Sequence, residues 1–413
     1  SSAGPVLAVL STRSLHFTPN LIVLSGPCSE SKAVLFLSCH NHLHCLNFHM
    51  SSTTPADKVR IHKFVRGGDV EKAYVDYLAN PHLYDSGNKV TVVFRRSEPW
   101  CSTRRDKMTA LYGILDEKLP NIPKFYPTVT CITLENVQGC TSATVTEDKE
   151  EIVNYIPIPS HLSHIPTVQI TELYKVTSLY MDVDRVIWQN QSWAFKLTGH
   201  NPEGNLREIS KLDQLSHSPF IIQIKAIVID RQNVIRGFIT PFMPRGDLSN
   251  VLDMEHREQG LSNDGCNAIV WSIKLAWARQ ITRGVADLHA IPTYHGDIKA
   301  ANVLIDETGH ALLIDLCPMG ITDAFAAPEI LAIIDDHATE FESKLTAMAD
   351  IYSLGLLLYA LAEETSSIAM PLIWRNEGTP MWYRDAVQRC IAEDCRARPT
   401  AAELLHSLGV HEL

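Results

Sequence analysis

The chain has 413 residues, of which 45% are hydrophobic and 20% charged, and its formal net charge at pH 7 is −11. These proportions are typical of a globular protein with a full hydrophobic core, and the length allows two or three domains. The negative charge argues against a broad surface for nucleic acid or anionic membranes, because such surfaces need clustered Lys and Arg.

The ten cysteines are scattered along the chain and form no C-x-x-C pair. This distribution predicts neither a disulfide framework nor a zinc finger of the usual spacing. We therefore expect an intracellular, cytoplasmic protein from a reducing compartment. The longest strongly apolar run, Leu354–Ala362, is too short to span a bilayer, and the opening residues lack the order of a secretory signal.

Residues 1–49 match no recognisable fold pattern and are interpreted as an unassigned leader. Five potential metal ligands fall within seven residues of this segment, namely Cys39, His40, His42, His44 and Cys45. Their spacing fits none of the usual zinc patterns, so we favour a leader without a metal and keep a metal site as the alternative. Met50 and the polar run after it are typical of a flexible start to the next region.

Residues 50–160 have the pattern of a small α/β accessory domain that ends in a linker. Lys89–Phe94 and Thr128–Leu134 are rich in strand-forming residues and predict two strands. Thr103–Leu119 has a helix-forming composition and stops before a proline. Pro157–Pro166 is rich in Pro, Ser and His, which is typical of a linker. We recognise no set of catalytic residues in this region.

Residues 165–413 are interpreted as one larger domain. Apolar periodicity predicts strands at Leu173–Tyr180, Arg185–Trp188, Ser192–Leu197, Ile221–Ile229 and Val234–Thr240, and helices at Leu206–Leu215 and Trp277–His289. In the third strand, alternation places Ala194 and Lys196 on one face. A lysine that points inward needs a carboxylate, and Glu208 on the following helix is the candidate partner.

Further along the chain, Asn302 and Asp315 are predicted to lie side by side at the open end of a β-hairpin. The apolar runs Val303–Ile305 and Leu312–Ile314 flank the turn signal Asp306–Gly309, and this pattern predicts two antiparallel strands. Asn302 directly precedes the first run and Asp315 directly follows the second. Their carboxamide and carboxylate oxygens suit Mg²⁺, which completes its shell with water and substrate phosphates.

Two charged residues lie in the loop that enters this hairpin. Asp297 stands five residues before Asn302, and Lys299 follows Asp297 by two residues. A carboxylate at this place is suited to accept the proton of an attacking hydroxyl, and a lysine is suited to steady a transferred phosphate. Base, cation and metal ligands in one short stretch predict a phosphoryl-transfer centre.

This stretch resembles the catalytic centre of the eukaryotic protein kinases. The family's loop reads H-R-D-L-K-x-x-N and is followed by a D-F-G triplet. The corresponding segments here are His295–Asn302 (HGDIKAAN) and Asp315–Cys317 (DLC). The resemblance implies an α+β, two-lobed kinase-like fold, with a β-rich N-lobe and an α-helical C-lobe, preceded here by the mixed α/β accessory region.

The resemblance also implies a role for each residue of the centre. Asp297 would be the catalytic base and Lys299 the cation that steadies the phosphate. Asn302 and Asp315 would bind Mg²⁺. Thr322 aligns with the threonine that bridges the catalytic Asp and Lys in Ser/Thr kinases, which favours Ser and Thr hydroxyls of protein substrates.

Residues expected to bind ATP follow from the same resemblance. The strand with Ala194 and Lys196 matches the V-A-I-K strand, which implies that Lys196 holds the α- and β-phosphates and pairs with Glu208. Ala194 would belong to the same nucleotide site. Thr240 would be the gatekeeper, and Met243 in the hinge would offer backbone hydrogen bonds to adenine.

Two further landmarks of the family are structural. Asp350 lies in a segment similar to D-x-W-S-x-G, whose aspartate anchors the backbone of the catalytic loop. Ala327-Pro328-Glu329 matches the A-P-E motif, and Arg398 would pair with Glu329.

The chain also departs from the family pattern. The turn Met181–Asp184 contains no glycine, although the family has a G-x-G-x-x-G loop over the ATP phosphates there. The backbone of such a turn cannot come as close to a phosphate, and its two carboxylates would repel one. In addition, Gly296 replaces the usual arginine and the segment before Ala327 is short, so we expect no activation by phosphorylation of that segment.

Three functions are consistent with these residues. The first is an active Ser/Thr protein kinase that uses ATP and Mg²⁺ on protein substrates. The second is a pseudokinase that serves as a scaffold or binding module, because the glycine loop is missing. The third is a small-molecule phosphotransferase, because the H-G-D form of the loop also occurs in aminoglycoside- and choline-kinase-like enzymes. No nucleic-acid partner or membrane span is expected, and the sequence leaves the oligomeric state open.

Overall fold

A computed structural model describes residues 58–410, apart from 68–69, 79, 81, 85–86, 96–114, 123, 138–139, 181, 200, 253–268, 318–320 and 336–343. The candidate metal ligands at 39–45 lie outside the described residues, as does the first part of the helix predicted at 103–119. The remainder of that helix is present, because residues 115–118 are helical and continue into the short helix η1 (Leu119–Asn121).

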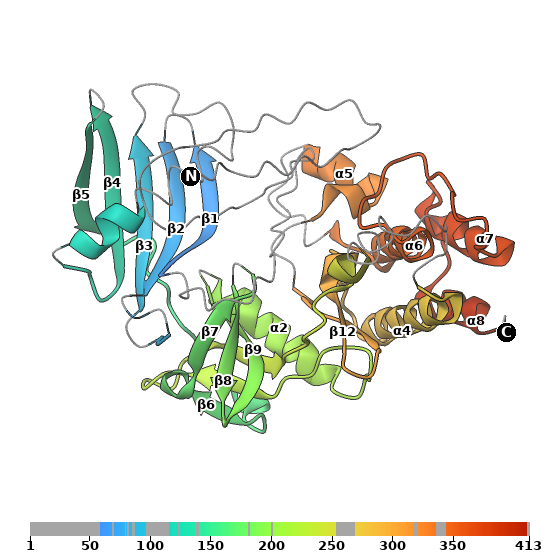
Figure 1. The fold of residues 1–413 in the computed structure, drawn as a ribbon, viewed down its shortest axis with the longest axis horizontal. Coiled ribbons are helices and arrows are strands. Elements are labelled where there is room, and N and C mark those ends of the chain that lie inside the picture. Colours follow the sequence, from blue (N-terminus) through green and yellow to red (C-terminus); the bar gives the residue numbers. More distant parts are fainter. Residues whose placement is uncertain are drawn as a thin grey trace, which may run out of the picture. The chain divides into compact units, whose positions relative to one another are not determined.

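The accessory region forms a five-stranded sheet in sequence order (Figure 1). Its strands are β1 (Val59–Gly67), β2 (Val70–Leu78), β3 (Gly87–Arg95), β4 (Val129–Val137) and β5 (Cys140–Glu147). β3 and β4 run parallel, and the other neighbours are antiparallel. The strands predicted at the positions of β3 and β4 are confirmed, whereas β1, β2 and β5 were not predicted.

The core of this sheet comes from alternate residues of its strands. Ala73 and Val75 of β2 and Val90 and Val92 of β3 are fully buried. Leu119 and its helical neighbours cover this face, so the sheet has its own hydrophobic core. β2 escaped prediction because the charged residues Glu71, Lys72 and Asp76 interrupt the strand and weaken its apolar signal.

A second sheet of six strands opens the next region. Its order is β6-β10-β11-β9-β8-β7, formed by β6 (Thr167–Gln169), β7 (Tyr174–Ser178), β8 (Val183–Trp188), β9 (Gln191–Leu197), β10 (Ala226–Ile229) and β11 (Ile235–Pro241). The helix α2 (Pro202–Gln214) follows β9. α2 begins four residues before the predicted start, where the side chain of Asn201 accepts a hydrogen bond of 2.9 Å from the amide of Gly204.

One predicted strand begins later than expected. The apolar run from Ile221 was assigned to a strand, but β10 starts only at Ala226. The amide of Ile222 donates to the carbonyl of Leu313 at 2.9 Å, and the amide of Leu313 donates to the carbonyl of Phe220 at 2.9 Å. The first residues of the run therefore pair with a hairpin of the lower lobe instead of extending β10.

The segment predicted as a linker packs against the second sheet. Leu162 and Ile165 are buried in the main hydrophobic core. The carbonyl of Pro166 accepts a hydrogen bond of 2.9 Å from the amide of Ile227 in β10. Residues 157–166 are thus held by apolar burial and by the sheet edge.

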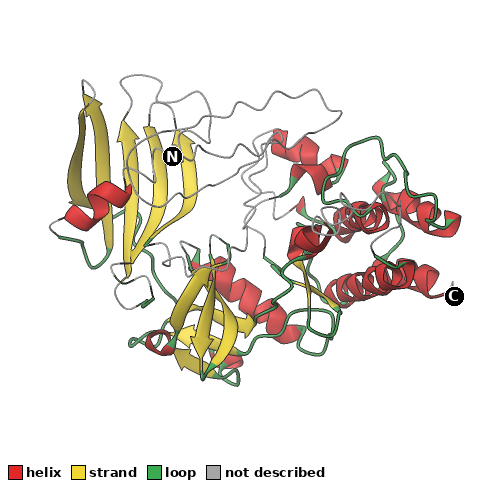
Figure 2. Ribbon diagram, in the orientation of Figure 1, coloured by secondary structure: helices red, strands yellow, loops and turns green. Residues whose placement is uncertain are grey.

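The C-terminal half is mainly helical (Figure 2). Its helices are α4 (Trp271–His289), α5 (Pro328–Asp335), α6 (Ala347–Glu363), α7 (Met381–Cys390) and α8 (Ala401–Val410). The predicted hairpin is confirmed as the antiparallel strands β12 (Val303–Ile305) and β13 (Ala311–Leu313). Among the described residues, no helix is both long enough and apolar enough to cross a membrane.

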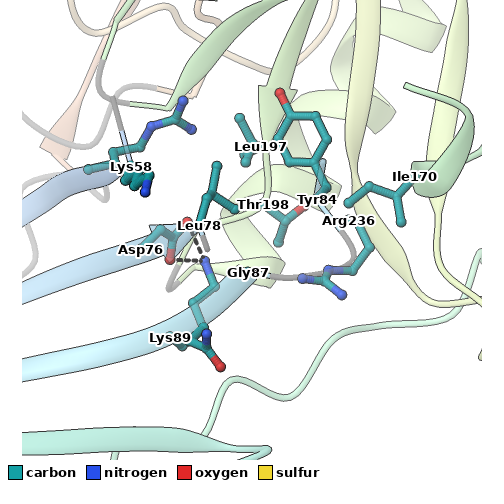
Figure 3. Close-up of a pocket in the computed structure, with 12 residues that line it drawn as sticks. Lys58, Asp76, Leu78, Tyr84, Gly87, Lys89, Ile170, Leu197, Thr198 and Arg236 are labelled. Carbon is teal, nitrogen blue, oxygen red and sulfur yellow. Dashed lines mark hydrogen bonds and ion pairs between the residues drawn. The ribbon is translucent and has the colours of Figure 1, made fainter. Parts of the chain in front are cut away.

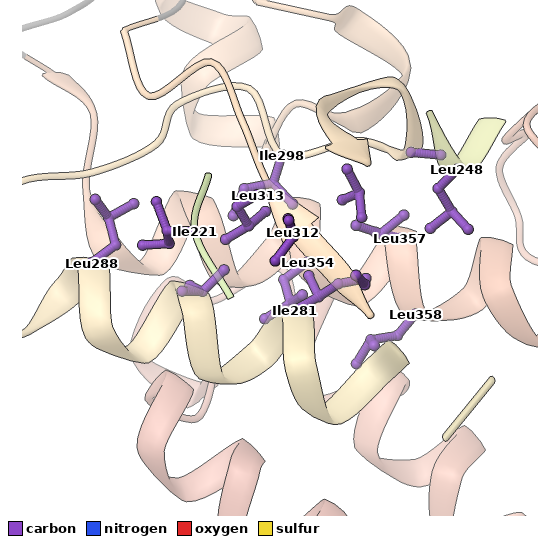
Figure 4. Packing of buried hydrophobic residues seen from close by; sticks show 14 of the residues in the cluster. Ile221, Leu248, Ile281, Leu288, Ile298, Leu312, Leu313, Leu354, Leu357 and Leu358 are labelled. Carbon is purple, nitrogen blue, oxygen red and sulfur yellow. The ribbon is translucent and has the colours of Figure 1, made fainter. Parts of the chain in front are cut away.

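The core of this half forms around α4, α6 and the hairpin. Figure 4 shows Ile281 of α4, Leu313 of β13 and Leu354 of α6 packed together. Every residue of α6 from Ala349 to Ala362 is buried, which explains why the longest apolar run of the sequence lies in this helix. Burial of this apolar surface fixes the hairpin in place.

An ion pair holds the start of α5 to the segment before α8. The two terminal nitrogens of Arg398 donate to the two carboxylate oxygens of Glu329 at 2.6 and 2.9 Å. The arginine side chain is completely buried, and it also donates to the carbonyls of Met348 and Ala392. The predicted Arg398–Glu329 pair is therefore present.

We expect Arg398→Ala to lower the free energy of unfolding of this region by about 3 kcal/mol, because it leaves the carboxylate and two carbonyls without their donor. Chemical denaturation measures the change. The matched control is Arg396→Ala at an exposed neighbouring position, with an expected change within about 0.5 kcal/mol. Equal decreases in the free energy of unfolding for Arg398→Ala and Arg396→Ala would contradict a structural role for the Arg398–Glu329 pair.

Candidate phosphoryl-transfer site

The ammonium group of Lys196 binds two carboxylates. Lys196 lies on β9, and its Nζ donates to Oε1 of Glu208 on α2 at 2.9 Å and to Oδ1 of Asp315 at 2.6 Å. Glu208 is only 3% exposed. The expected pair with Glu208 is present, and the contact with Asp315 links the second sheet to the residue that follows β13.

The three charges strongly shift each other's proton affinities. Burial raises the pKa of Glu208 to about 7, because the lysine only partly offsets the loss of water and the Asp315 carboxylate repels a second negative charge. Burial alone would lower the pKa of Lys196 and raise that of Asp315. The attraction between them outweighs burial, so the pKa of Lys196 is raised and that of Asp315 is lowered.

Asp297 lies at the centre of a second group of contacts. Its Oδ2 accepts hydrogen bonds from Nζ of Lys299 at 2.6 Å and from the side-chain amide of Asn302 at 3.2 Å. Its Oδ1 accepts one from the backbone amide of Thr322 at 3.0 Å. Lys299 also donates to the Thr322 hydroxyl at 2.7 Å. The structure thus brings together the four residues predicted for this part of the site.

The loop that carries Asp297 is anchored from below by a buried aspartate of α6. The two carboxylate oxygens of Asp350 accept hydrogen bonds of 2.8 Å from the backbone amides of His295 and Gly296. Gly296 has φ +84°, a left-handed conformation that favours glycine. The anchoring predicted for Asp350 is therefore present, and it fixes the backbone of the two residues that precede Asp297.

Asn302 and Asp315 lie at the open end of the β12–β13 hairpin, as expected. The amide of Ile314 donates to the carbonyl of Asn302 at 3.1 Å, so the two ends of the hairpin are adjacent. The side-chain amide nitrogen of Asn302 donates to the carbonyl and the carboxylate of Asp297. This bonding distinguishes the two ends of the carboxamide and leaves its oxygen as the potential metal ligand.

These donors fit Mg²⁺ better than a softer metal. Mg²⁺ is usually held by one or two protein oxygens together with substrate phosphates and water, and Asn302 and Asp315 offer such oxygens. Within the part of the chain that the structure describes, there is no group of three or more His, Cys, Asp or Glu residues that could hold a metal ion on its own.

Comparison with protein families identifies the fold that carries this site. The protein kinase domain model matches residues 186–408, which is more than half of the chain. This chain belongs to the protein kinase family. The second sheet with α2 is its N-lobe, and the helical half is its C-lobe.

Individual relatives agree with this assignment, although their identity to the chain is low. The chain is 29% identical over 195 residues to the probable serine/threonine-protein kinase PBL3 of Arabidopsis thaliana, which covers 43% of this chain and 41% of the relative. It is 26% identical over 236 residues to ribosomal protein S6 kinase alpha-3 of Homo sapiens. This aligned region covers 53% of this chain and 30% of the relative. The chain therefore spans less than half of the length of each of these relatives.

The kinase domain differs from its family at the turn between β7 and β8, where the sequence has no glycine. The amides of Leu179 and Tyr180 donate to the carbonyl of Val183 at 2.8 and 3.1 Å, which closes a tight turn. The Tyr180 hydroxyl donates to the buried carboxylate of Asp247 in the segment after β11. Burial and this carboxylate raise the pKa of Tyr180, so its hydroxyl stays protonated and acts as the donor.

The hinge residues lie close to the strand that carries Lys196. Ala194 of β9 pairs in register with Thr240 of β11, the predicted gatekeeper. Met243 follows β11 and packs partly against the main core, and its carbonyl accepts a hydrogen bond of 3.1 Å from the amide of Gly246. Tyr180, Asp247 and the contact between them were not singled out by the sequence.

A pH-dependent stability follows from the raised pKa of Glu208. The folded protein binds this proton more tightly than the unfolded chain, so the group stabilises the fold at low pH and the stabilisation is lost as the pH rises toward 7. Between pH 5 and pH 7.5 the wild type should lose about 2 kcal/mol that Glu208→Gln does not lose. Denaturant titrations at the two pH values measure this difference.

The matched control is Glu203→Gln, which neutralises an exposed carboxylate on the same helix and should leave the pH dependence of the wild type unchanged. If the free energy of unfolding of Glu208→Gln depended on pH in the same way as that of the wild type, this would contradict the raised pKa of Glu208.

Proposed function

We propose that this chain transfers the γ-phosphoryl group of ATP to Ser or Thr hydroxyls of protein substrates, with Mg²⁺ as the metal. The observation that carries the proposal is the complete set of contacts around Asp297, Lys299 and Thr322, assembled beside the bridged Lys196. Membership of the protein kinase family supports it. One of the relatives named above is a probable serine/threonine-protein kinase by name, which supports the choice of hydroxyl substrates.

Asp297 would act as the base. Its carboxylate would accept the proton of the substrate hydroxyl as that oxygen attacks the phosphorus. Lys299 and the backbone amide of Thr322 hold the carboxylate in one orientation through its two oxygens. The same lysine would offset the charge that develops on the transferred phosphoryl group.

Lys196 would bind the α- and β-phosphates of ATP, with Glu208 holding the lysine in place. The hinge backbone at Met243 would receive the adenine, with Ala194 on the neighbouring strand. Asn302 and Asp315 would hold Mg²⁺, and the metal would neutralise charge on the phosphates when it is bound. The hydrogen bonds from Asn302 to Asp297 tie the proposed metal ligand to the proposed base.

A scaffold function is the second candidate, and one observation favours it. The β7–β8 turn has no glycine and is tied to the C-lobe by Tyr180, so its backbone has less freedom to follow a phosphate. A small-molecule phosphotransferase has less support, because Arg398, Glu329 and Asp350 make the contacts typical of protein-kinase C-lobes.

The proposed base is tested by Asp297→Asn. This variant should lower the rate of phosphoryl transfer from labelled ATP to Ser/Thr peptide arrays by about 10²–10⁴-fold, while the Kd for Mg·ATP changes little. Exposed Asp323→Asn, one residue after Thr322, is the matched control and should retain the wild-type rate.

Parallel assays with small hydroxylated metabolites separate the alternatives. Labelling of metabolites but not of peptides would favour the small-molecule phosphotransferase. Binding of Mg·ATP without any transfer would favour the scaffold. Equal transfer rates for the wild type and Asp297→Asn would contradict the assigned base.

A further inference from the structure

A buried ion pair joins the accessory sheet to the N-lobe of the kinase domain. A terminal nitrogen of Arg60 on β1 contacts Oδ1 of Asp184 on β8 and donates to the Ser178 hydroxyl at the end of β7 at 3.0 Å. Asp184 is completely buried, and its other carboxylate oxygen accepts a hydrogen bond of 2.6 Å from the Tyr84 hydroxyl. Lys175 lies 3.7 Å from the same carboxylate.

These contacts lie at the end of the β7–β8 hairpin, next to its turn. Ser178 and Asp184 are cross-strand partners and form the last pair before the β7–β8 turn. Arg60 therefore holds both strands at the base of that turn. The side chains of Asp184 and Phe195 lie on the face of the N-lobe sheet that is opposite to Lys196, because residues alternate along β8 and β9.

The other side of the turn reaches the proposed nucleotide site. Val183 pairs in register with Lys196, and the carbonyl of Asp182 accepts a hydrogen bond of 2.7 Å from the amide of Leu197. Tyr180 at the tip contacts Asp247 of the C-lobe. A shift of the Ser178–Asp184 pair would thus move the residues beside the phosphate-binding lysine and the tyrosine contact.

The joint between the accessory sheet and the N-lobe is local. The two sheets have separate hydrophobic clusters, and Tyr84, which lies between β2 and β3, packs edge-on against Phe195 of the N-lobe cluster with ring centroids 5.1 Å apart. A cavity of about 50 Å³ lies beside this contact; its lining includes Leu78, Leu197 and the paired Lys89 and Asp76 (Figure 3). Among the described residues, His82 also joins the accessory region to β7: its carbonyl accepts a hydrogen bond of 3.0 Å from the amide of Lys175, and its ring stacks on Tyr174.

We propose that Arg60 is a positioning residue for the nucleotide, and that the accessory sheet sets the affinity for Mg·ATP through Asp184 and the β7–β8 turn. We call Arg60, Asp184 and Ser178 the clamp. From the sheet face opposite Lys196, the clamp restrains a turn that lacks the glycines of its family. The inference rests on the proposed function, because it assigns the accessory sheet a role in binding the nucleotide of that same site.

Arg60→Ala in the full chain tests the proposal. Hydrogen–deuterium exchange of peptides covering residues 174–188 should become faster without nucleotide, because the buried carboxylate loses its contact with Arg60 and keeps only Tyr84 and the more distant Lys175. The Kd and KM for Mg·ATP should rise about tenfold, while kcat at saturating ATP changes less than about twofold. Arg60→Lys keeps the charge and should recover part of the affinity.

Lys72→Ala is the matched control, because it removes a cation of the accessory sheet that pairs with Asp148 and Glu151 of the same region and does not neighbour Arg60. It should leave both the exchange of the β7–β8 hairpin and the KM for ATP unchanged. A double-mutant cycle that combines Arg60→Ala with Tyr180→Phe tests whether the effect on Mg·ATP binding passes through the turn. The double variant with Arg60→Ala should bind Mg·ATP within about twofold of Arg60→Ala alone if the two residues act in series.

Unchanged exchange or an unchanged Kd in Arg60→Ala would overturn the positioning role while leaving the proposed function intact. An equal rise of KM in Lys72→Ala would overturn it too, since the effect would then be a general loss of the sheet. Absence of Mg·ATP binding by the wild type would overturn both the proposed function and this role.

Discussion

The interaction on which the site depends is the pairing of one lysine with two carboxylates. Glu208 comes from α2 of the N-lobe, Asp315 follows β13 of the C-lobe, and Lys196 binds both at once. Burial raises the pKa of Glu208 to about 7, and the Asp315 carboxylate adds to this because two negative charges share one positive charge. The cluster joins the two lobes at the residues expected to bind phosphate and metal.

A second set of contacts fixes the loop that carries Asp297. Asp350 of the buried helix α6 holds the backbone of the loop before Asp297, and the loop in turn presents Asp297 to Lys299 and Thr322. The apolar core around α4, α6 and the hairpin keeps these parts in register. Hydrophobic burial therefore fixes positions, and the short polar contacts fix orientations.

Much of this site was predictable from the sequence because its signals are local. Asn302, Asp315 and the turn between them span fourteen residues, and two short apolar runs suffice to predict the hairpin. Lys196 and Glu208 were paired by strand alternation and by the need of an inward lysine for a carboxylate. The N-lobe strands and the helix α4 followed from periodicity, although the run from Ile221 was misassigned because its partner, β13, is distant in sequence.

The remaining contacts depend on tertiary placement that no local pattern reveals. Arg60 and Asp184 are separated by more than one hundred residues, and Tyr180 and Asp247 by more than sixty. The strands β1 and β5 have no simple apolar alternation, so the accessory sheet could be predicted only in part. The turn without glycine was visible in the sequence, but the two restraints on either side of it, at Asp184 and Asp247, were not.

The proposed function requires this kinase domain to bind Mg·ATP although its β7–β8 turn has no glycine. Calorimetric titration of the full chain with a non-hydrolysable Mg·ATP analogue tests it most directly, beside Lys196→Met and the same titration without Mg²⁺. We expect saturable binding by the wild type that weakens strongly in the variant and without metal. No heat of binding from a folded wild-type chain, or equal binding by Lys196→Met, would contradict it.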